Sequence, residues 1–241
     1  MLSSKSTLRS IALEQPATIR VFERFHLDYC CGGSRPLGEV CAEKGIEPEK
    51  LLAALEEATT NAPATKDFTQ ATLAELIRHI VDTHHAYVRS ELARLQPMAQ
   101  RVATKHGPAH PEVTLIERDL LQLGDDLLFH LHKEERILFP YIEALERSRN
   151  ENAAAPISCF GTVQSPIQAM IQEHEGAAVL LEEMRTRSDG FVPPADACPT
   201  YVGLYHGLDA FERDLHRHVH LENNLLFPRG IALEKEILVA Q

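Results

Sequence analysis

Two segments of the chain repeat one arrangement of residues that can bind a metal ion. The first reads HLHKEERILFP from His130, and the second reads HVHLENNLLFP from His218. Each has a glutamate four positions after its first histidine, which gives the pairs His130–Glu134 and His218–Glu222. Residues i and i+4 of an α-helix share a face, so each pair can direct its imidazole and its carboxylate at one point. Imidazole nitrogens and carboxylate oxygens are common ligands of first-row metal ions.

One further histidine lies upstream of each pair at nearly the same separation. His85, in DTHHAY, precedes His130, and His174, in QEHEGA, precedes His218. Apolar residues flank these histidines at helical spacing, which places them on stripes that face a core. The same spacing favours His85 over its neighbour His84. The chain is therefore predicted to contain two copies of a helix pair, with one histidine on the first helix and His-x-x-x-Glu on the second.

Other polar residues on the two His-x-x-x-Glu helices have different expected roles. His132 and His220 lie two positions after the ligand histidines, so they point about 200° away and cannot serve the same site. Asp126 and Asp214 lie one turn before the ligand histidines. They can hydrogen-bond those histidines from outside the ligand set, or they can lie on a solvated helix face.

The six core-facing residues predict a two-metal site. Four imidazoles and two carboxylates would be very costly to bury among leucines without partners. Six ligands are too many for one zinc ion, and the mixed nitrogen and oxygen set fits iron or manganese. We expect two histidines on each metal, with Glu134 and Glu222 as bridges. One His-x-x-x-Glu alone would more often be an exposed ion pair, but two copies with matched histidines favour metal binding.

The elements that position these residues are predicted to be helices throughout. Four long amphipathic patterns, at about 73–105, 111–146, 166–187 and 200–227, predict an antiparallel four-helix bundle over residues 68–241. Residues 1–62 predict a small helical domain with a turn at Cys30-Cys31-Gly32-Gly33. The polar stretch TTNAPATKD (59–67) is expected to link the two. The fold class is therefore all-α.

Composition narrows the class of protein. The chain has 241 residues, 44% of them hydrophobic, and can bury a sizeable core. Its net charge of −11 argues against a nucleic-acid partner. It has neither a long apolar run for a membrane helix nor the apolar core of a signal peptide, so we expect a cytoplasmic protein that does not contact membranes.

The five cysteines do not form a disulfide framework typical of a secreted protein. Cys30 and Cys31 are adjacent, and a disulfide between neighbours is strained, so free thiols are expected. Their position on a Gly-Gly turn predicts exposure and reactivity, and hence a redox or transient iron-handling role. The alternative is a buried packing role.

The motifs together resemble a known family. Residues 68–241, with KEERILFP, QEH and LENNLLFP, resemble the hemerythrin-like family, and the LDYCCGG element resembles the small domain of the iron–sulfur cluster repair di-iron proteins. The resemblance implies two iron ions in a non-haem, carboxylate-bridged centre. It also implies a role for Glu173 near the site or its access path. The ligands it implies are His85, His130, Glu134, His174, His218 and Glu222.

The resemblance also implies a function. We expect a protein of the nitrosative and oxidative stress response that repairs damaged iron–sulfur clusters by supplying iron. The alternative is a nitric oxide-binding or nitric oxide-reducing di-iron protein linked to denitrification, and a third class is a metal store or sensor. The expected partners are damaged or apo iron–sulfur proteins, nitric oxide or dioxygen as small ligands, and a second copy of the chain in a homodimer. Oxygen-carrying hemerythrins use seven ligands, five histidines and two carboxylates. No seventh ligand is obvious here, which argues against oxygen carriage.

Overall fold

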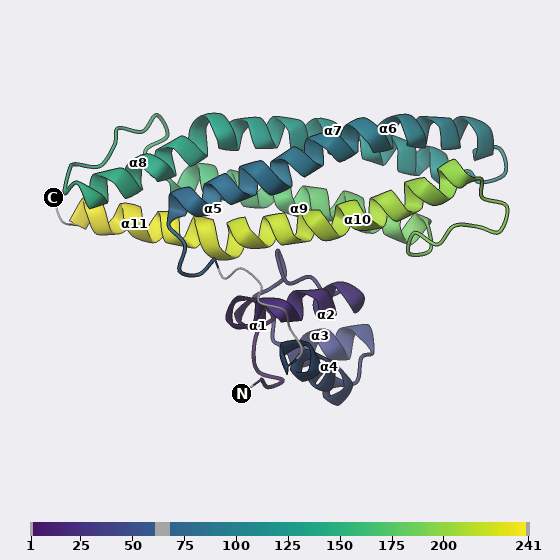
Figure 1. Cartoon of the computed structure of the whole chain (residues 1–241), viewed down its shortest axis with the longest axis horizontal. Coiled ribbons are helices and arrows are strands. Elements are labelled where there is room, and N and C mark those ends of the chain that lie inside the picture. Colours follow the sequence, from purple (N-terminus) through teal and green to yellow (C-terminus); the bar gives the residue numbers. More distant parts are fainter. Residues whose placement is uncertain (1, 61–67, 240–241) are drawn as a thin grey trace.

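The computed structural model of the protein describes residues 2–60 and 68–239, and these are helical apart from their connections. No strand is formed in these two ranges; a single β-bridge joins Thr7 and Pro36. The helices form a long bundle and a smaller N-terminal group that packs against one side of it (Figure 1). The prediction of an all-α protein is confirmed.

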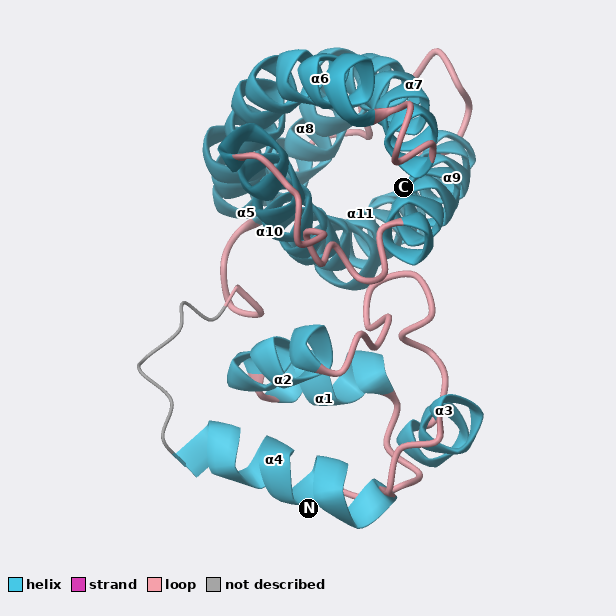
Figure 2. Ribbon diagram, turned by 90° about the vertical axis from the view of Figure 1, so that its right-hand side faces the viewer, coloured by secondary structure: helices cyan, strands magenta, loops and turns pink. Residues whose placement is uncertain are grey.

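Four long helices run the length of the bundle, and three of them contain one π-helical turn. In chain order they consist of α5 (Leu73–His79), η2 (Ile80–His85) and α6 (Ala86–His106); α7 (Glu112–Lys133), η3 (Glu134–Leu138) and α8 (Phe139–Asn150); α9 (Gln164–Arg187); and α10 (Pro199–Leu221), η4 (Glu222–Leu226) and α11 (Phe227–Val239). Viewed nearly end-on, they surround a common axis (Figure 2). Short connections make neighbouring long helices antiparallel, as expected for this class of bundle.

The second long helix ends later than predicted, at Asn150 instead of 146. The fourth runs on through Pro228 to Val239. Pro140 and Pro228 lie inside these helices, and each is separated from the preceding π-helical turn by one phenylalanine. The wider turn leaves room for the proline ring, which would clash in an unbroken α-helix.

The bundle core consists of two apolar clusters separated along its axis. One cluster is formed by α6, α7, the second half of α9 and α10, and includes Leu95, Leu123 and Phe211. The other is formed by α5, α8, the start of α9 and α11, and includes Ile142 and Phe227. The predicted ligands lie in the chain between the segments that supply these two clusters. A polar site is thus enclosed by apolar layers on both sides, where electrostatic interactions are strong.

Buried or capping carboxylates fix the helix ends near this core. Thr72 and Glu75 form a capping box at the start of α5. Glu146 of α8 accepts hydrogen bonds from the backbone N–H groups of residues 73 and 74, which joins the first and second long helices. The buried Glu234 of α11 accepts from the Val163 N–H at 3.0 Å, at the start of α9. Each bond satisfies a donor that a helix leaves free at its N-terminus.

The N-terminal group has its own apolar core. It consists of α1 (Leu8–Glu14), η1 (Pro16–Thr18), α2 (Ile19–Arg24), α3 (Leu37–Lys44) and α4 (Pro48–Thr60). Leu8, Phe22, Leu37 and Leu51 are among the side chains buried in it. Of the predicted linker, residues 59 and 60 still belong to α4, and residues 61–67 lie outside the described part of the chain. None of the helices described is long and apolar enough to cross a membrane.

Polar and aromatic contacts join the N-terminal domain to α10 and η4. Arg217 donates two hydrogen bonds to Glu23, at 2.6 and 2.7 Å. Asn224 Nδ2 donates to the backbone carbonyl of Tyr29 at 3.1 Å, and the Tyr29 ring lies edge-on to His220 with centroids 5.4 Å apart. The residues that follow Tyr29, the cysteine pair, are therefore held against the helix that carries a predicted ligand pair.

Candidate metal centre

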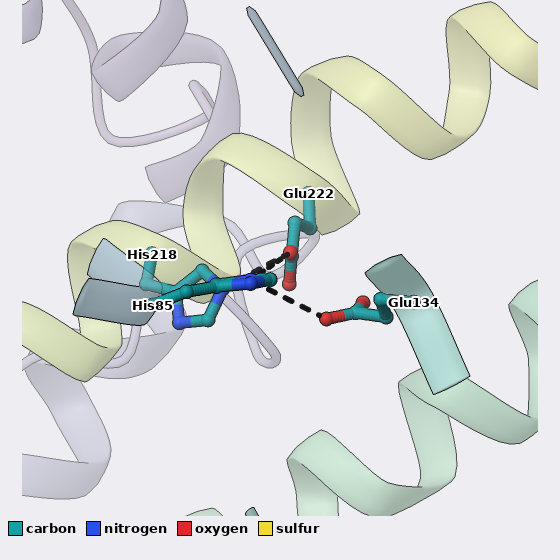
Figure 3. A group of neighbouring side chains, drawn as sticks. All are labelled: His85, Glu134, His218 and Glu222. Atoms are coloured by element: carbon teal, nitrogen blue, oxygen red, sulfur yellow. Dashed lines mark hydrogen bonds and ion pairs between the residues drawn. The ribbon is translucent and has the colours of Figure 1, made fainter. Parts of the chain in front are cut away.

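The six predicted ligands converge in the middle of the bundle. They form two overlapping groups whose ligand atoms lie within 4.8 Å of one another, and both groups contain Glu134 and Glu222. One group adds His85 and His218 (Figure 3). The other group adds His130 and His174. All six side chains are at most 2% exposed. Two carboxylates shared by two pairs of histidines is the arrangement expected of a bridged two-metal site.

The histidines face each other in pairs through their Nε2 atoms. His85 Nε2 lies 3.1 Å from His218 Nε2, and His174 Nε2 lies 3.0 Å from His130 Nε2. Glutamate oxygens complete each pair, with His130 Nε2 at 3.3 Å from Glu134. Two imidazole lone pairs at this distance repel unless a cation or a proton lies between them, so the donor set is suited to cations.

The carboxylates supply a second sign of cation binding. Both oxygens of Glu134 and Oε2 of Glu222 are buried and make no hydrogen bond within the described residues. A buried carboxylate without hydrogen-bond partners is costly, and natural proteins rarely keep one without a function. A metal ion would use these oxygens as ligands. The residues present therefore fit a metal centre of mixed nitrogen and oxygen ligands.

Three of the six ligands lie at a π-helical turn. His85 ends η2, Glu134 begins η3 and Glu222 begins η4. A π-helical turn inserts one residue into an α-helix and is found mainly at functional sites. The ligand helix without such a turn, α9, contributes only His174. The periodicity of the apolar residues did not predict these turns, because each turn adds only one residue and the apolar pattern continues on either side of it.

Hydrogen bonds behind three of the histidines select the ring nitrogen that faces the site. His85 Nδ1 donates to Glu135 at 2.7 Å, His130 Nδ1 to Glu173 at 2.8 Å, and His174 Nδ1 to Asn223 at 3.0 Å. The acceptors are carboxylate or amide oxygens, so Nδ1 carries the proton. Nε2 is then free to bind a metal, as outer hydrogen bonds typically arrange for ligand histidines.

Sequence reasoning found only one of these three partners. Glu173 was expected near the site, and it bonds His130. Glu135 and Asn223 were missed, although each directly follows a predicted bridging glutamate. The position directly after the glutamate is the same in both copies of the repeat, and this could have indicated that the two residues share a role.

The two aspartates do not make the expected bonds to ligand histidines. Asp214 bonds His84 Nδ1 at 3.1 Å, and the His84 ring stacks on the ligand His218 with centroids 5.6 Å apart. Asp126 is exposed and accepts from Gln122 at 2.9 Å. Asp214 thus contacts His218 only indirectly, through His84, whereas Asp126 lies on the helix surface. For Asp126 the solvated helix face, the second of the two expected roles, is the one observed, because Glu173 of α9 already bonds His130 Nδ1.

The neighbouring carboxylates control the charge of the His130 imidazole. Burial opposes protonation of His130, but the Glu134 carboxylate and the hydrogen bond to Glu173 outweigh it and raise the pKa of His130 to about 10. The hydrogen bond from His130, against some burial, in turn lowers the pKa of Glu173 to about 2, and Lys133 adds to this effect. Without a metal, the negative charge of this half of the site thus favours a bound proton. A metal cation would replace that proton.

His132 and His220 both point away from the six ligands, as predicted. They differ in burial: His132 is exposed, whereas His220 is 3% exposed beneath the N-terminal domain. Burial, with a contribution from Arg9, lowers the pKa of His220 to about 4. The two histidines differ because the N-terminal domain covers the face of α10 that carries His220.

Comparison with known proteins identifies both parts of the chain. A family model described as the hemerythrin HHE cation binding domain matches residues 76–229, and the ScdA_N model, described as a domain of unknown function, matches residues 4–59. The chain belongs to the hemerythrin family. The buried His and Glu residues lie within the matched hemerythrin domain, and they fit a metal centre.

Relatives resemble the chain over nearly its whole length. The iron-sulfur cluster repair protein YtfE of Musicola paradisiaca is 37% identical over 94% of this chain and 96% of its own length. YtfE of Escherichia coli O157:H7 is 34% identical over 94% and 97%. The iron-sulfur cluster repair protein ScdA of Staphylococcus haemolyticus is 30% identical over 94% and 98%. The likeness therefore includes the N-terminal domain as well as the hemerythrin domain.

The cysteine pair lies where the N-terminal domain meets the hemerythrin domain. Asp28 accepts hydrogen bonds from the N–H groups of Cys30 and Cys31 at 3.0 and 2.9 Å, and from Gly32 at 2.8 Å. Gly33 has no room for a side chain, because a Cβ would lie 2.3 Å from the Tyr29 carbonyl oxygen. The turn is thus wound tightly around Asp28.

The two thiols are not equivalent. Their Sγ atoms lie 3.9 Å apart, and Cys30 is only 4% exposed and packs in the apolar core of the bundle. The hydrogen bond to Cys31, burial and the Asp28 carboxylate raise the pKa of the Cys30 thiol well above its usual value. The predicted exposure is therefore wrong for Cys30, and Cys31 is half-buried.

Two cavities approach the hemerythrin centre. One of about 470 Å³ lies between the N-terminal domain and the bundle, and its lining includes Leu13, Phe68, His84 and Asp214. The other, of about 320 Å³, opens between α7 and α9 and is lined in part by His130, Glu173 and His174. The smaller cavity thus reaches two of the candidate ligands directly, whereas the larger one ends at His84, whose ring stacks on His218.

Proposed function

We propose that the hemerythrin domain holds two iron ions. His85 and His218 would bind one, and His130 and His174 the other, with Glu134 and Glu222 shared between them. The shared carboxylates carry this proposal, because each belongs to both groups of ligand atoms. Nitrogen and oxygen ligands without a thiolate favour iron or manganese over softer metals. Metal analysis should give about two irons per chain, and one zinc without iron would contradict the proposal.

We propose that this iron serves the repair of damaged iron–sulfur clusters in the stress response. Three relatives named as iron-sulfur cluster repair proteins match over almost their full length, which supports a common function. The ligand set supports iron supply, because carboxylate bridges exchange more readily than thiolate or porphyrin ligands. Glu135, Glu173 and Asn223 would orient the ligand imidazoles by holding a proton on Nδ1, so that Nε2 faces the metal.

The cysteine pair extends the proposal to iron delivery. Asp28, Cys30 and Cys31 place three potential ligand atoms within 4.8 Å of one another. Two thiols and one carboxylate do not complete a stable site, so they suit transient binding of iron that leaves the bundle. The acceptor would be a damaged or apo iron–sulfur protein.

Transfer to an apo-cluster protein tests this function. The iron-loaded protein should restore the cluster spectrum of an apo-ferredoxin supplied with sulfide, faster than an equal amount of free ferrous iron in the presence of a chelator. Replacing Glu134 by Ala should abolish the transfer, while replacing the exposed His132 by Gln should leave it intact. Equal rates for the protein and for chelated iron would reject repair by iron supply.

Nitric oxide binding or reduction is the second candidate. It is favoured by the mostly apolar lining of the larger cavity, which suits an uncharged diatomic molecule and leads to His84 beside His218. Nitrous oxide formation by the reduced protein would support this activity, and a stable nitrosyl spectrum without turnover would support binding alone. The cytoplasmic location and the homodimer belong to the same proposal; light scattering of the purified protein tests the dimer.

A further inference from the structure

One side chain touches both the metal centre and the cysteine pair. Asn223 Oδ1 accepts a hydrogen bond from Nδ1 of the ligand His174 at 3.0 Å. Asn223 Nδ2 points to Cys31 Sγ at 3.9 Å, a long but directed contact between an N–H donor and a sulfur. The carboxamide of Asn223 is therefore the bridge between a predicted ligand and a thiol of the other domain.

The direction of the amide follows from the chemistry of its neighbours. A histidine that binds a metal through Nε2 carries its proton on Nδ1, so the atom facing it must be an acceptor. The amide oxygen of Asn223 meets this need, and its NH₂ group is then turned to Cys31. Metal binding at Nε2 makes Nδ1–H a stronger donor, polarises the amide and strengthens the N–H donor that faces the sulfur.

The other half of the bundle provides an internal comparison. Glu135 occupies the position equivalent to Asn223, directly after the other shared glutamate, and bonds His85 Nδ1. Its carboxylate has no N–H group, and it accepts a hydrogen bond from Arg89 at 2.8 Å. In the first half, the residue behind the histidine is therefore part of a surface ion pair. In the second half, the equivalent residue is an amide, which can accept a hydrogen bond from an imidazole and donate one to a thiol at the same time.

The neighbouring residue keeps the cysteine turn in place. Asn224 Nδ2 donates to the Tyr29 carbonyl oxygen at 3.1 Å, one residue before Cys30. Asp28 holds the turn from within through the Cys30 and Cys31 N–H groups. The Cys31 sulfur is thus positioned from both sides, and its place opposite Asn223 does not depend on a loose loop.

We propose that Asn223 is a positioning residue that couples Cys31 to the metal ligand His174. It orients the imidazole for the metal and gives the thiol a donor whose strength depends on metal occupancy. This inference rests on the proposed two-metal site, and it adds that loading of the site is sensed at Cys31. By linkage, a change at Cys31 must also alter the metal environment on the His174 side.

Thiol alkylation of the full-length protein tests the coupling. Iodoacetamide labelling of Cys31, measured by peptide mass spectrometry, should be roughly threefold or more faster in the iron-loaded than in the metal-free protein, because a stronger donor favours the thiolate. The exposed Cys159 is the internal reference and should label at the same rate in both forms. The Asn223→Asp variant keeps an acceptor for His174 and removes the N–H donor, so its two forms should label Cys31 at equal rates.

Two further variants complete the design. Asn223→Ala removes both contacts and should also equalise the rates, while Glu135→Gln alters the equivalent position without touching Cys31 and should retain the difference. Equal rates in the wild type, or a difference that persists in Asn223→Asp, would overturn the coupling. If the protein takes up no iron, the proposed di-iron function fails. The same rate comparison with zinc-loaded protein then still decides whether Asn223 couples the two sites.

Discussion

The two halves of the bundle, residues 73–150 and 164–239, present the same ligands to the centre and differ in what lies behind them. Behind the first half, Glu135 and Arg89 form an ion pair at the surface, and His132 faces solvent. Behind the second half, Asn223 and His220 lie beneath the N-terminal domain. The repeated motif thus builds a nearly symmetrical metal site inside an asymmetrical protein. The symmetry suits the proposed binding of two metals, and the asymmetry would give one of them a neighbouring thiol pair.

The largest expected effect comes from the shared carboxylates. Glu134→Ala and Glu222→Ala should each lose most of the bound metal, because each removes a ligand from both pairs of histidines. His132→Ala, on the outer face of the same helix as Glu134, should keep it. Metal analysis of the purified variants measures this. Loss of only one metal in either glutamate variant would show that the carboxylate is not shared.

Removal of the metal should destabilise both halves together. Ligands that bind only the folded state contribute about 4 kcal/mol at a thousandfold excess over Kd, which corresponds to a fall of about 10 °C in Tm for a chain of this size. Calorimetry of the chelator-treated and reloaded protein measures the difference. An unchanged Tm would mean that the buried carboxylates find full compensation without metal.

Acid should affect the second half more than the first through His220. Because its pKa is lowered to about 4 in the folded protein, from about 6.5 in an unfolded chain, its contribution is present above pH 6.5. The contribution is lost as the pH falls from 6.5 towards 4. The total loss of stability is at most about 3 kcal/mol.

Denaturant unfolding of the metal-free protein at pH 7 and pH 4.5 measures this effect. His220→Gln should lose less stability on acidification than the wild type, and the exposed His132→Gln should behave like the wild type. Identical pH dependence of the two variants would show that the N-terminal domain does not shield His220 in solution.

The smallest expected effect concerns the outer partners of the ligands. Glu173→Gln keeps a hydrogen-bond acceptor for His130 but removes a negative charge, so metal affinity should fall about tenfold. Glu135→Gln should weaken affinity to a similar degree on the other histidine pair. Competition with a chelator of known affinity measures both. An affinity unchanged by Glu173→Gln would assign Glu173 to the helix surface, with Lys133 as its only functional partner.

Helical periodicity was enough to predict the ligands and the bundle. The i, i+4 geometry of His130–Glu134 and His218–Glu222 is a local property of a helix, and apolar flanks at helical spacing identified the face that turns inward. The same local reasoning separated His85 from His84 and turned His132 and His220 away from the site. Helix ends were less accurate, because the last turn of the second long helix, residues 147–150, is polar and carries no apolar periodicity.

Contacts between distant segments had to come from the tertiary structure. Glu135 reaches His85, Glu173 reaches His130 and Asn223 reaches His174 from other helices. The matched position of Glu135 and Asn223 in the repeat marks them as candidates, but it does not say which histidine each one meets. The burial of Cys30 and His220 depends on how one domain packs on another, since the same residues would be exposed on either part alone. The sequence by itself therefore determined the six candidate ligands and the helices that carry them. Only the tertiary structure decided their hydrogen-bond partners, the π-helical turns and the asymmetry between the two halves, because these depend on packing between segments that helical periodicity does not relate.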